Sequence, residues 1–213
     1  MTSACLSTAY LAPVSYYKTL CNRDHIIVEK CCNYVKQTYR NRCNIISANG
    51  LIPLSVPVIK PDTAKCLTRD IRISDHDNWQ HMHWNAIVSA YGSSPFFEYY
   101  QDDIIPFFEK KLSGTFLFDL NESLRETICR LLEITPNVVY SDEYVDYTGS
   151  ETDDFRDVIH PKKEIDKRFH LQPYYQVFSS KFGFIPDASI LDLLFNMGPE
   201  SQLVLYDLSL IHI

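Results

Sequence analysis

The chain has 213 residues, of which 46% are hydrophobic and 13% aromatic, and a net charge of −7 at pH 7. This composition excludes intrinsic disorder, and the length fits one domain with a sizeable core. No run approaches the roughly 18 apolar residues of a membrane span, and the amino terminus lacks a basic region followed by a long apolar run. We therefore expect a cytoplasmic protein.

Seven cysteines form an odd set without a CxxC pair. An odd set of this kind is typical of free thiols in a reducing compartment, and most of them are expected to be small core residues.

The first part of the chain predicts an α/β fold. A strand over 4–7, a helix over 15–21 and a strand over 25–29 form a β-α-β unit. Further strands are expected from alternating residues over 34–45, 51–59 and 69–74. We predict a single α/β domain spanning residues 1–213, with a mixed central sheet flanked by helices.

The central stretch predicts a helix, because Trp79, His83, Ile87 and Ala90 recur at helical spacing. Asp77 or Asn78 is expected to cap its start, and Gly92 follows its end. Ser94-Pro95 predicts the start of another helix, which restarts or kinks at Pro106. Its aromatic residues from Phe96 to Tyr100 are expected in the core, the alternative being a stacking surface.

The last third mixes helices with an irregular acidic stretch. The sequence DLNE at 119–122 resembles a capping box that opens a helix to Ile134. A closing helix is expected from Ala188 to Met197, capped by Asp187, with Asp192 buried and in need of a partner. Regular patterning disappears over 136–170, and we expect a mobile acidic loop at 141–170.

Charge is unevenly distributed along the chain. Residues 30–72 carry eight basic and two acidic residues, whereas 141–157 carry seven acidic residues and only Arg156. A basic third in an acidic protein predicts a site for a small anion more than a nucleic-acid groove. Two alternatives are a solvated basic face and a structural ion-pair network.

The candidate binding residues are basic or amide side chains, because guanidinium groups match carboxylate and phosphate oxygens. They are Lys36, Arg40, Arg42, Asn44 and Arg72. The acids nearest to this basic row in sequence are Glu29 and Asp62. We predict that Arg40, Arg42 and His83 converge on one small anion.

His83 is the candidate acid/base, because imidazole exchanges protons near neutral pH. The alternative is a core histidine whose nitrogens are satisfied by neighbours. A metal site on His76, His81 and His83 is disfavoured, because helical spacing places His81 and His83 on different faces, and no metal ligand is assigned. No Walker loop, GxGxxG, GxSxG or HExxH motif is present, and the cofactor is unknown.

Several blocks resemble the WbqC-like protein family, in its short form typical of Bacteroidetes. They are YRNRCNI, GLIPLSVPV, DIRISDHDNW followed by HMHWNAIVSAY, PFFEYY, DLNESLRETICRLLEI and YYQVFSSKFGFIPDASILDLLFNMGPE. Members of this family are often found with surface-polysaccharide and nucleotide-sugar genes, so the resemblance implies a role in that biosynthesis. It therefore implies transfer chemistry on an amino sugar or a similar small molecule.

The chain departs from the family at the loop after the first strand. Many members have His-Gln-Pro-x-Tyr-x-Pro there, whereas this chain has Leu6 to Ala9, retains Tyr10 and has Pro13 displaced by one position. Tyr10 is therefore added to the candidate substrate-binding residues. Loops of this kind commonly bind ligands in α/β proteins.

The leading hypothesis is a transferase-type enzyme for an anionic small molecule such as a nucleotide-linked amino sugar. The alternative is a non-catalytic small-molecule-binding or scaffold protein. Nucleic-acid binding ranks third because of the negative net charge, and the oligomeric state cannot be inferred from the sequence.

Overall fold

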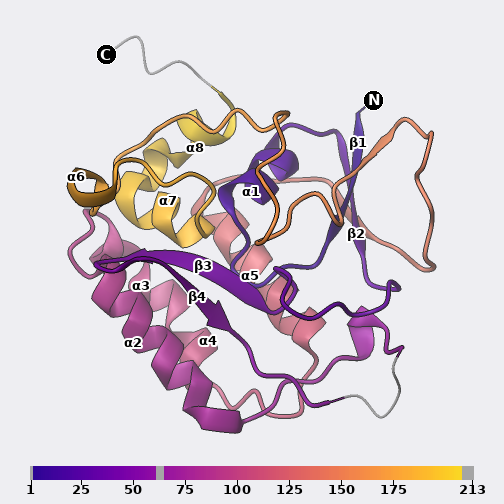
Figure 1. Ribbon diagram of the computed structural model, residues 1–213, viewed down its shortest axis with the longest axis horizontal. Helices are drawn as coiled ribbons and strands as arrows, with labels where there is room; N and C mark the ends of the chain where they lie inside the picture. The colour runs from indigo at the N-terminus through magenta and orange to yellow at the C-terminus, as the bar shows by residue number, and fades with distance from the viewer. Residues whose placement is uncertain (1, 61–64, 208–213) are drawn as a thin grey trace.

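Four parallel strands form the central sheet in the order β5-β2-β1-β6 (Figure 1). The computed structural model describes residues 2–60 and 65–207. The strands are β1 (Ser3–Ser7), β2 (His25–Glu29), β5 (Val138–Tyr140) and β6 (Thr152–Asp154). All three pairings are parallel, so the four carboxyl ends lie at one edge of the sheet.

The β-α-β unit is confirmed. Helix α1 (Val14–Cys21) connects β1 to β2, and Leu6 of β1 pairs with Val28 of β2. Both strands consist largely of buried apolar residues, as parallel strands do when their faces are covered.

The antiparallel part of the fold is a separate hairpin of β3 (Arg42–Ser47) and β4 (Gly50–Ser55). Its turn uses Gly50 at a φ of 93°, in the left-handed region that favours glycine. The α/β class is confirmed, and the parallel and antiparallel pairings expected in one mixed sheet are distributed over two sheets.

Two strand predictions were wrong in part. Residues 34–41 turn instead of extending, because Gln37 adopts a φ of 60° and the Thr38 hydroxyl donates to the Val35 carbonyl. Residues 68–70 form the 3₁₀ helix η1 (Thr68–Asp70), after which Arg72 and Ile73 make only isolated bridges. Alternation in sequence cannot distinguish a strand from a chain that turns.

The middle third of the chain forms a group of α-helices, the first of which packs against β3 of the hairpin (Figure 1). They are α2 (Trp79–Tyr91), α3 (Phe97–Ile104), α4 (Pro106–Glu109) and α5 (Leu117–Leu131), with the 3₁₀ helix η2 (His76–Asn78) before α2. The restart at Pro106 is confirmed. The expected caps were wrong: neither Asp77 nor Asn78 makes a side-chain cap bond, and α5 begins at Leu117, before the expected capping box.

The carboxyl-terminal helices are α6 (Ser179–Phe182), α7 (Ile190–Met197), η3 (Gly198–Glu200) and α8 (Ser201–Leu205). Asp192 is buried, as expected, and accepts hydrogen bonds from Tyr174 (2.7 Å) and Gln176 (2.8 Å). The cap of α7 is Ser189, whose hydroxyl accepts from the Leu191 amide; Asp187 instead binds Ser15 in α1.

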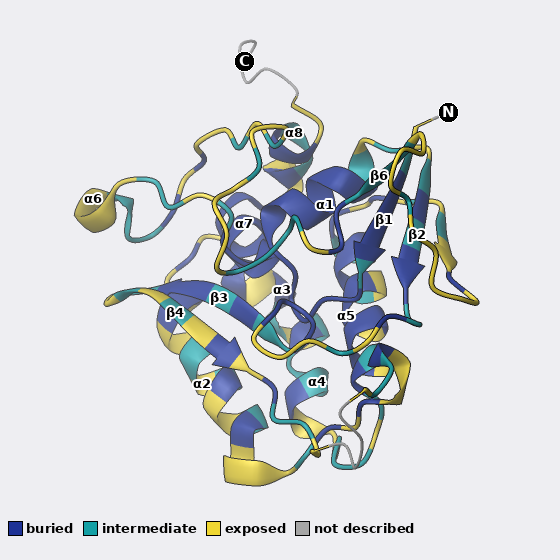
Figure 2. Cartoon of the chain, turned by 45° about the vertical axis from the view of Figure 1, so that its right-hand side comes forward, coloured by how far each residue is buried: buried dark blue, intermediate teal, exposed yellow. Residues whose placement is uncertain are grey.

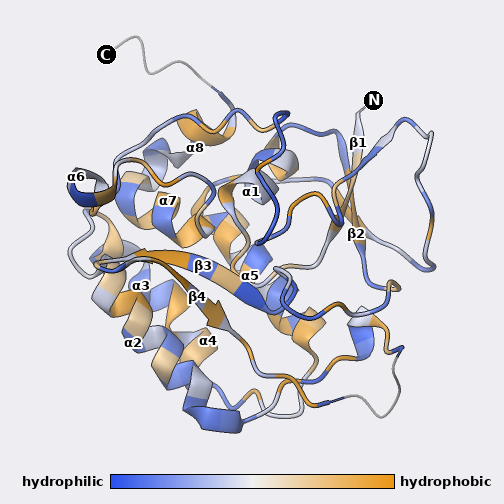
Figure 3. Ribbon diagram, in the orientation of Figure 1, coloured by the Kyte–Doolittle hydropathy of each residue, from blue (hydrophilic) through white to orange (hydrophobic). Residues whose placement is uncertain are grey.

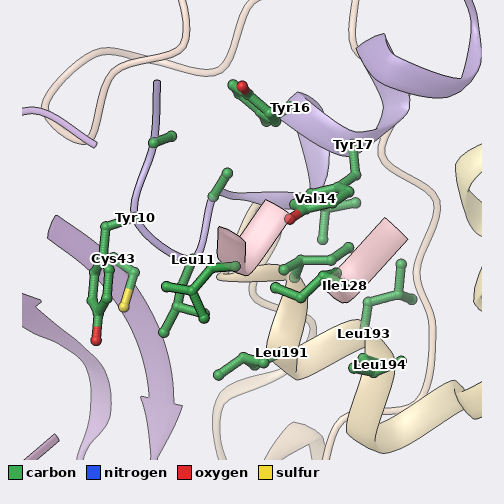
Figure 4. Packing of buried hydrophobic residues seen from close by; sticks show 14 of the residues in the cluster. Tyr10, Leu11, Val14, Tyr16, Tyr17, Cys43, Ile128, Leu191, Leu193 and Leu194 are labelled. Carbon is green, nitrogen blue, oxygen red and sulfur yellow. The ribbon is translucent and has the colours of Figure 1, made fainter. Parts of the chain in front are cut away.

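The core lies where the loop after β1 meets α5 and α7 (Figure 4). Tyr10 and Leu11 from that loop, Ile128 from α5 and Leu191 from α7 are all buried. Figure 2 shows exposed residues concentrated on the outer faces of α2 and β4. Along β3, hydropathy changes from hydrophilic near Arg42 to hydrophobic near Ile46 (Figure 3).

The acidic stretch is only partly irregular. Residues 152–154 form β6, which was not expected because two of its three residues are aspartates. Asp153 is paired with Arg23 (2.9 Å) and Arg168 (3.2 Å), which are distant in sequence. The mobility expected of the loop and the single-domain organisation stay predictions. In the part of the chain that the structure describes, no helix has the length and hydrophobicity needed to cross a membrane.

Candidate anion-binding cleft

The cleft begins at the carboxyl ends of β1 and β6. The chain leaves β1 through α1 toward β2, whereas β6 pairs with the opposite side of β1. The strand order therefore reverses between β1 and β6, and open α/β sheets commonly bind ligands at such a point. Ser7, Thr8 and Arg156 follow these strand ends and line a small cavity there.

Arg156 is fully paired with carboxylates. It contacts Asp154 through Nε (2.9 Å) and Nη2 (2.5 Å), and its Nη1 donates to Glu29 Oε2 (3.3 Å). Glu29 is 1% exposed and also accepts from the Ser141 hydroxyl (2.7 Å). This network joins the ends of β2 and β6, so its charges need no ligand.

Arg40 differs, because it is 4% exposed and no carboxylate in the described part of the chain pairs with it. Its Nη1 lies 3.4 Å from the Thr38 hydroxyl and its Nη2 3.5 Å from the Cys32 sulfur. Both contacts are long and involve neutral groups, and Nε has no hydrogen-bond partner. A buried guanidinium in this state is energetically costly unless an anion binds it.

Neither acid that is close to Arg40 in sequence neutralises it. Glu29 binds Arg156, and Asp62 lies outside the described residues. The carbonyl of Arg40 accepts from the buried Asn121 amide (2.8 Å), which fixes the backbone at this position. Within residues 2–60 and 65–207, the basic group is therefore held in place without a counter-charge.

Two cavities adjoin across Tyr39 and Ile159. We call the one lined by Arg40, Arg156, Ser7 and Thr8 the inner chamber; its volume is about 10 Å³. The outer chamber has a volume of about 150 Å³ and is lined by Asn44, the α1 residue Ser15, Asp187 and the segment 158–166. We call the two chambers, whose linings share Tyr39 and Ile159, the cleft; Arg40 and Arg156 line its smaller, inner end.

The outer chamber contains the titratable side chains Asp187 and His160. Burial raises the pKa of Asp187 to about 6, while its hydrogen bonds from Ser15 act in the opposite direction. Burial and the nearby Lys163 lower the pKa of His160. Asp187 can therefore exchange protons close to neutral pH in the outer chamber.

Of the predicted binding residues, Arg40 and Asn44 reach the cleft, one in each chamber. Arg42 instead donates to the Ser55 hydroxyl (3.0 Å), and Lys36 is exposed on the turn before Arg40. Arg72 donates to the Gly114 carbonyl (2.7 Å) and lies 4.1 Å from the centre of the Phe116 ring. The structure thus separates the residues of the predicted basic row.

His83 and Tyr10 form a buried pair away from the cleft. The Tyr10 hydroxyl lies 2.9 Å from His83 Nδ1, and His83 also bonds the Ser55 backbone. Burial lowers the pKa of His83 to about 4, so it is neutral at physiological pH. His83 lines neither chamber, and the expected convergence of Arg40, Arg42 and His83 is not seen.

The other histidines near His83 have separate partners. His76 pairs with Asp77 (2.7 Å), and His81 lies 2.9 Å from the Asn85 amide. The described residues contain no group of three or more His, Cys, Asp or Glu side chains placed to hold a metal ion.

Sequence reasoning missed Arg156, His160 and Asp187 as cleft residues. Arg156 carried a signal, because it is the only basic residue within the acidic stretch 141–157. Asp187 had been assigned to α7, whereas its carboxylate accepts from the Ser15 amide (2.7 Å) and hydroxyl (3.0 Å) of α1. That contact joins residues far apart in sequence and has no local pattern.

The fold and the cleft define a parallel α/β protein with a charged, ligand-sized cleft at the carboxyl edge of its sheet. The chain belongs to the WbqC-like protein family, whose model matches residues 8–168. It is similar to "Uncharacterized protein Rv1507c" of Mycobacterium tuberculosis, with 25% identity over 221 residues, covering 93% of this chain and 94% of that protein. No solved structure matched the chain.

Proposed function

We propose that the protein is a transferase-type enzyme that binds an anionic small molecule in the cleft. The substrate class is a nucleotide-linked amino sugar or a molecule transferred to one, in surface-polysaccharide biosynthesis. We also propose that the chain is the short form of the family typical of Bacteroidetes.

The observation that carries this proposal is the buried guanidinium of Arg40, which has no carboxylate partner among the residues that the structure describes. Arg156 lines the same chamber but is neutralised by Asp154 and Glu29, so Arg40 supplies the uncompensated charge. An anionic group beside Arg40 would receive charge-assisted hydrogen bonds in a site of low polarity, where they are strong.

Two further observations support the proposal. Family membership favours the polysaccharide context, and the family match includes Arg40, Asn44 and Arg156. All seven cysteines are free thiols, which favours a reducing compartment such as the cytoplasm.

Catalysis is assigned to the cleft itself. His83 was the expected acid/base, but its sealed contact with Tyr10 favours a structural role in joining α2 to the loop after β1. His160 lines the outer chamber and has its Nδ1 accepting from the Lys162 amide (3.1 Å). The Nε2 of His160 is therefore the imidazole atom available to a substrate.

A thermal-shift screen of nucleotide sugars, acyl donors and amino acids tests the proposal. A ligand at about 100 times its Kd stabilises the folded state by about 2.7 kcal/mol. We expect stabilisation by anionic members of the screen in the wild type and its loss in Arg40→Met. Absence of stabilisation by any anionic compound would contradict the proposal.

The second candidate is a non-catalytic binding protein, and the sealing of His83 favours it. A scaffold role for the aromatic stretch is less supported, because Phe97 and Tyr100 are buried and only Tyr99 of the three is exposed. Once a ligand is found, it can be incubated for a long time with the protein and each class of acceptor. Recovery of the ligand unchanged would favour a non-catalytic binding protein.

A further inference from the structure

The two chambers of the cleft carry opposite uncompensated charges. Arg40 lines the inner chamber, and no carboxylate in the described part of the chain pairs with its guanidinium. The outer chamber contains the Asp187 carboxylate, which binds only the amide and hydroxyl of Ser15 within that same part. Each charged group would therefore be stabilised by a ligand group of opposite sign.

Other groups around Asp187 do not supply the missing cation. Lys163 also lines the outer chamber; its ammonium keeps its charge and donates to the Asp157 carbonyl (2.6 Å), and among the described residues it forms no ion pair with Asp187. Glu164 adds a further acidic group to the same lining, whereas Asp166 is paired with Arg168 (3.0 Å). The potential in the outer chamber thus favours a positive ligand group, whereas the potential at Arg40 favours a negative one.

The backbone conformation of Asp187 also indicates a ligand site at its carboxylate. Its φ is 57°, in the left-handed region that is uncommon for residues other than glycine. Such conformations persist where surrounding contacts impose them, and they are frequent at ligand sites. Here Ser15 at the start of α1 imposes it and directs the carboxylate to the cavity wall.

The volumes limit the size of the ligand. A cavity of about 150 Å³ holds a molecule of roughly six to ten non-hydrogen atoms, since benzene occupies a cavity of that size. The inner chamber, at about 10 Å³, has room for about one water-sized group, so a single anionic oxygen of the ligand would enter it. A nucleotide is too large for this space and would lie outside the cleft.

We propose that the cleft binds a small zwitterion of the amino-acid class, with its carboxylate at Arg40 and its ammonium group at Asp187. This inference rests on the proposed function and specifies the ligand of the same site. Asn44 lies on the same wall of the outer chamber and supplies neutral hydrogen-bonding groups beside the ammonium. A ligand that spans both chambers passes between Tyr39 and the partly exposed Ile159.

Calorimetric titration with matched pairs of compounds tests the inference. Glycine, β-alanine and 4-aminobutanoate are each compared with the same acid without its amino group: acetate, propanoate and butanoate. We expect one amino compound to bind at least tenfold more tightly than its deaminated partner. Asp187→Asn should reduce that advantage to less than threefold while leaving binding of the deaminated acid unchanged.

Ser15→Ala is the control, because it removes one hydrogen bond to Asp187 but retains the carboxylate. It should keep most of the tenfold preference, and circular dichroism should show all variants folded. Equal binding of amino and deaminated acids would overturn the inference while leaving an anion site at Arg40. Absence of stabilisation by every anionic compound of the thermal-shift screen, nucleotide sugars and acyl donors included, would instead overturn the proposed function.

Discussion

Replacing Arg40 with methionine should stabilise the protein. The substitution retains much of the buried side-chain volume. It removes a cation that is 4% exposed and that pairs with no carboxylate in the described part of the chain. Replacing buried charged groups with apolar ones of similar size is often neutral or stabilising by about 1–4 kcal/mol. For a chain of this length, each kcal/mol corresponds to about 2–4 °C in Tm.

Arg156→Met is the matched comparison, because Arg156 lines the same chamber but is paired. Its removal leaves Glu29, at 1% exposed, without its guanidinium partner. Breaking a buried pair in this way costs about 3–5 kcal/mol. The midpoint of urea unfolding at pH 7 without ligand should therefore rise in Arg40→Met and fall in Arg156→Met. A loss of stability in Arg40→Met as large as that in Arg156→Met would refute the assignment of Arg40 as unpaired.

Two other predictions concern stability. Burial lowers the folded-state pKa of His83 from 6.5 to about 4. The neutral imidazole therefore contributes fully to the free energy of unfolding above pH 6.5, and this contribution is lost as the pH falls from 6.5 through 4. Urea unfolding should show wild type losing about 2–3 kcal/mol more than His83→Gln between pH 7 and 4.5, whereas equal losses would contradict a neutral buried imidazole. Gly198→Ala would place a Cβ 2.6 Å from the Phe96 ring at a φ of 53°, so thermal unfolding should show a loss of about 1–3 kcal/mol. Gly149→Ala, which also has a positive φ but no atom within 4 Å, should cost less.

Local patterns predicted the elements that form from neighbouring residues. The β-α-β unit, α2, the Pro106 restart and the buried Asp192 followed from spacing, turn residues and burial rules. The strand β6 did not, because its aspartates are compensated by arginines at positions 23, 156 and 168. Such pairing is set by the tertiary fold and leaves no periodic signal in the sequence.

The candidate site was predicted only in part, because some of its residues are also positioned by tertiary contacts. Arg40 was identified from the local excess of basic residues, but the turn at Gln37 separates it from Lys36 and redirects the row. His83 was correctly placed on the inward face of α2, and that face meets Tyr10 instead of the cleft. Asp187 could not be identified, because its partner Ser15 lies at the other end of the chain.

The most direct test of the unpaired Arg40 is a ¹H–¹⁵N spectrum of the arginine Nε–H groups, with Arg40 assigned from Arg40→Met. The Nε atoms of Arg125 and Arg156 already donate to Glu122 (2.8 Å) and Asp154 (2.9 Å) and serve as internal references. Titration with β-alanine and 4-aminobutanoate should shift the Arg40 resonance, because an anion beside the guanidinium changes its electronic environment, while both references stay unchanged. An Arg40 resonance that already lies with the references without ligand, or that does not move at saturating ligand, would contradict the account.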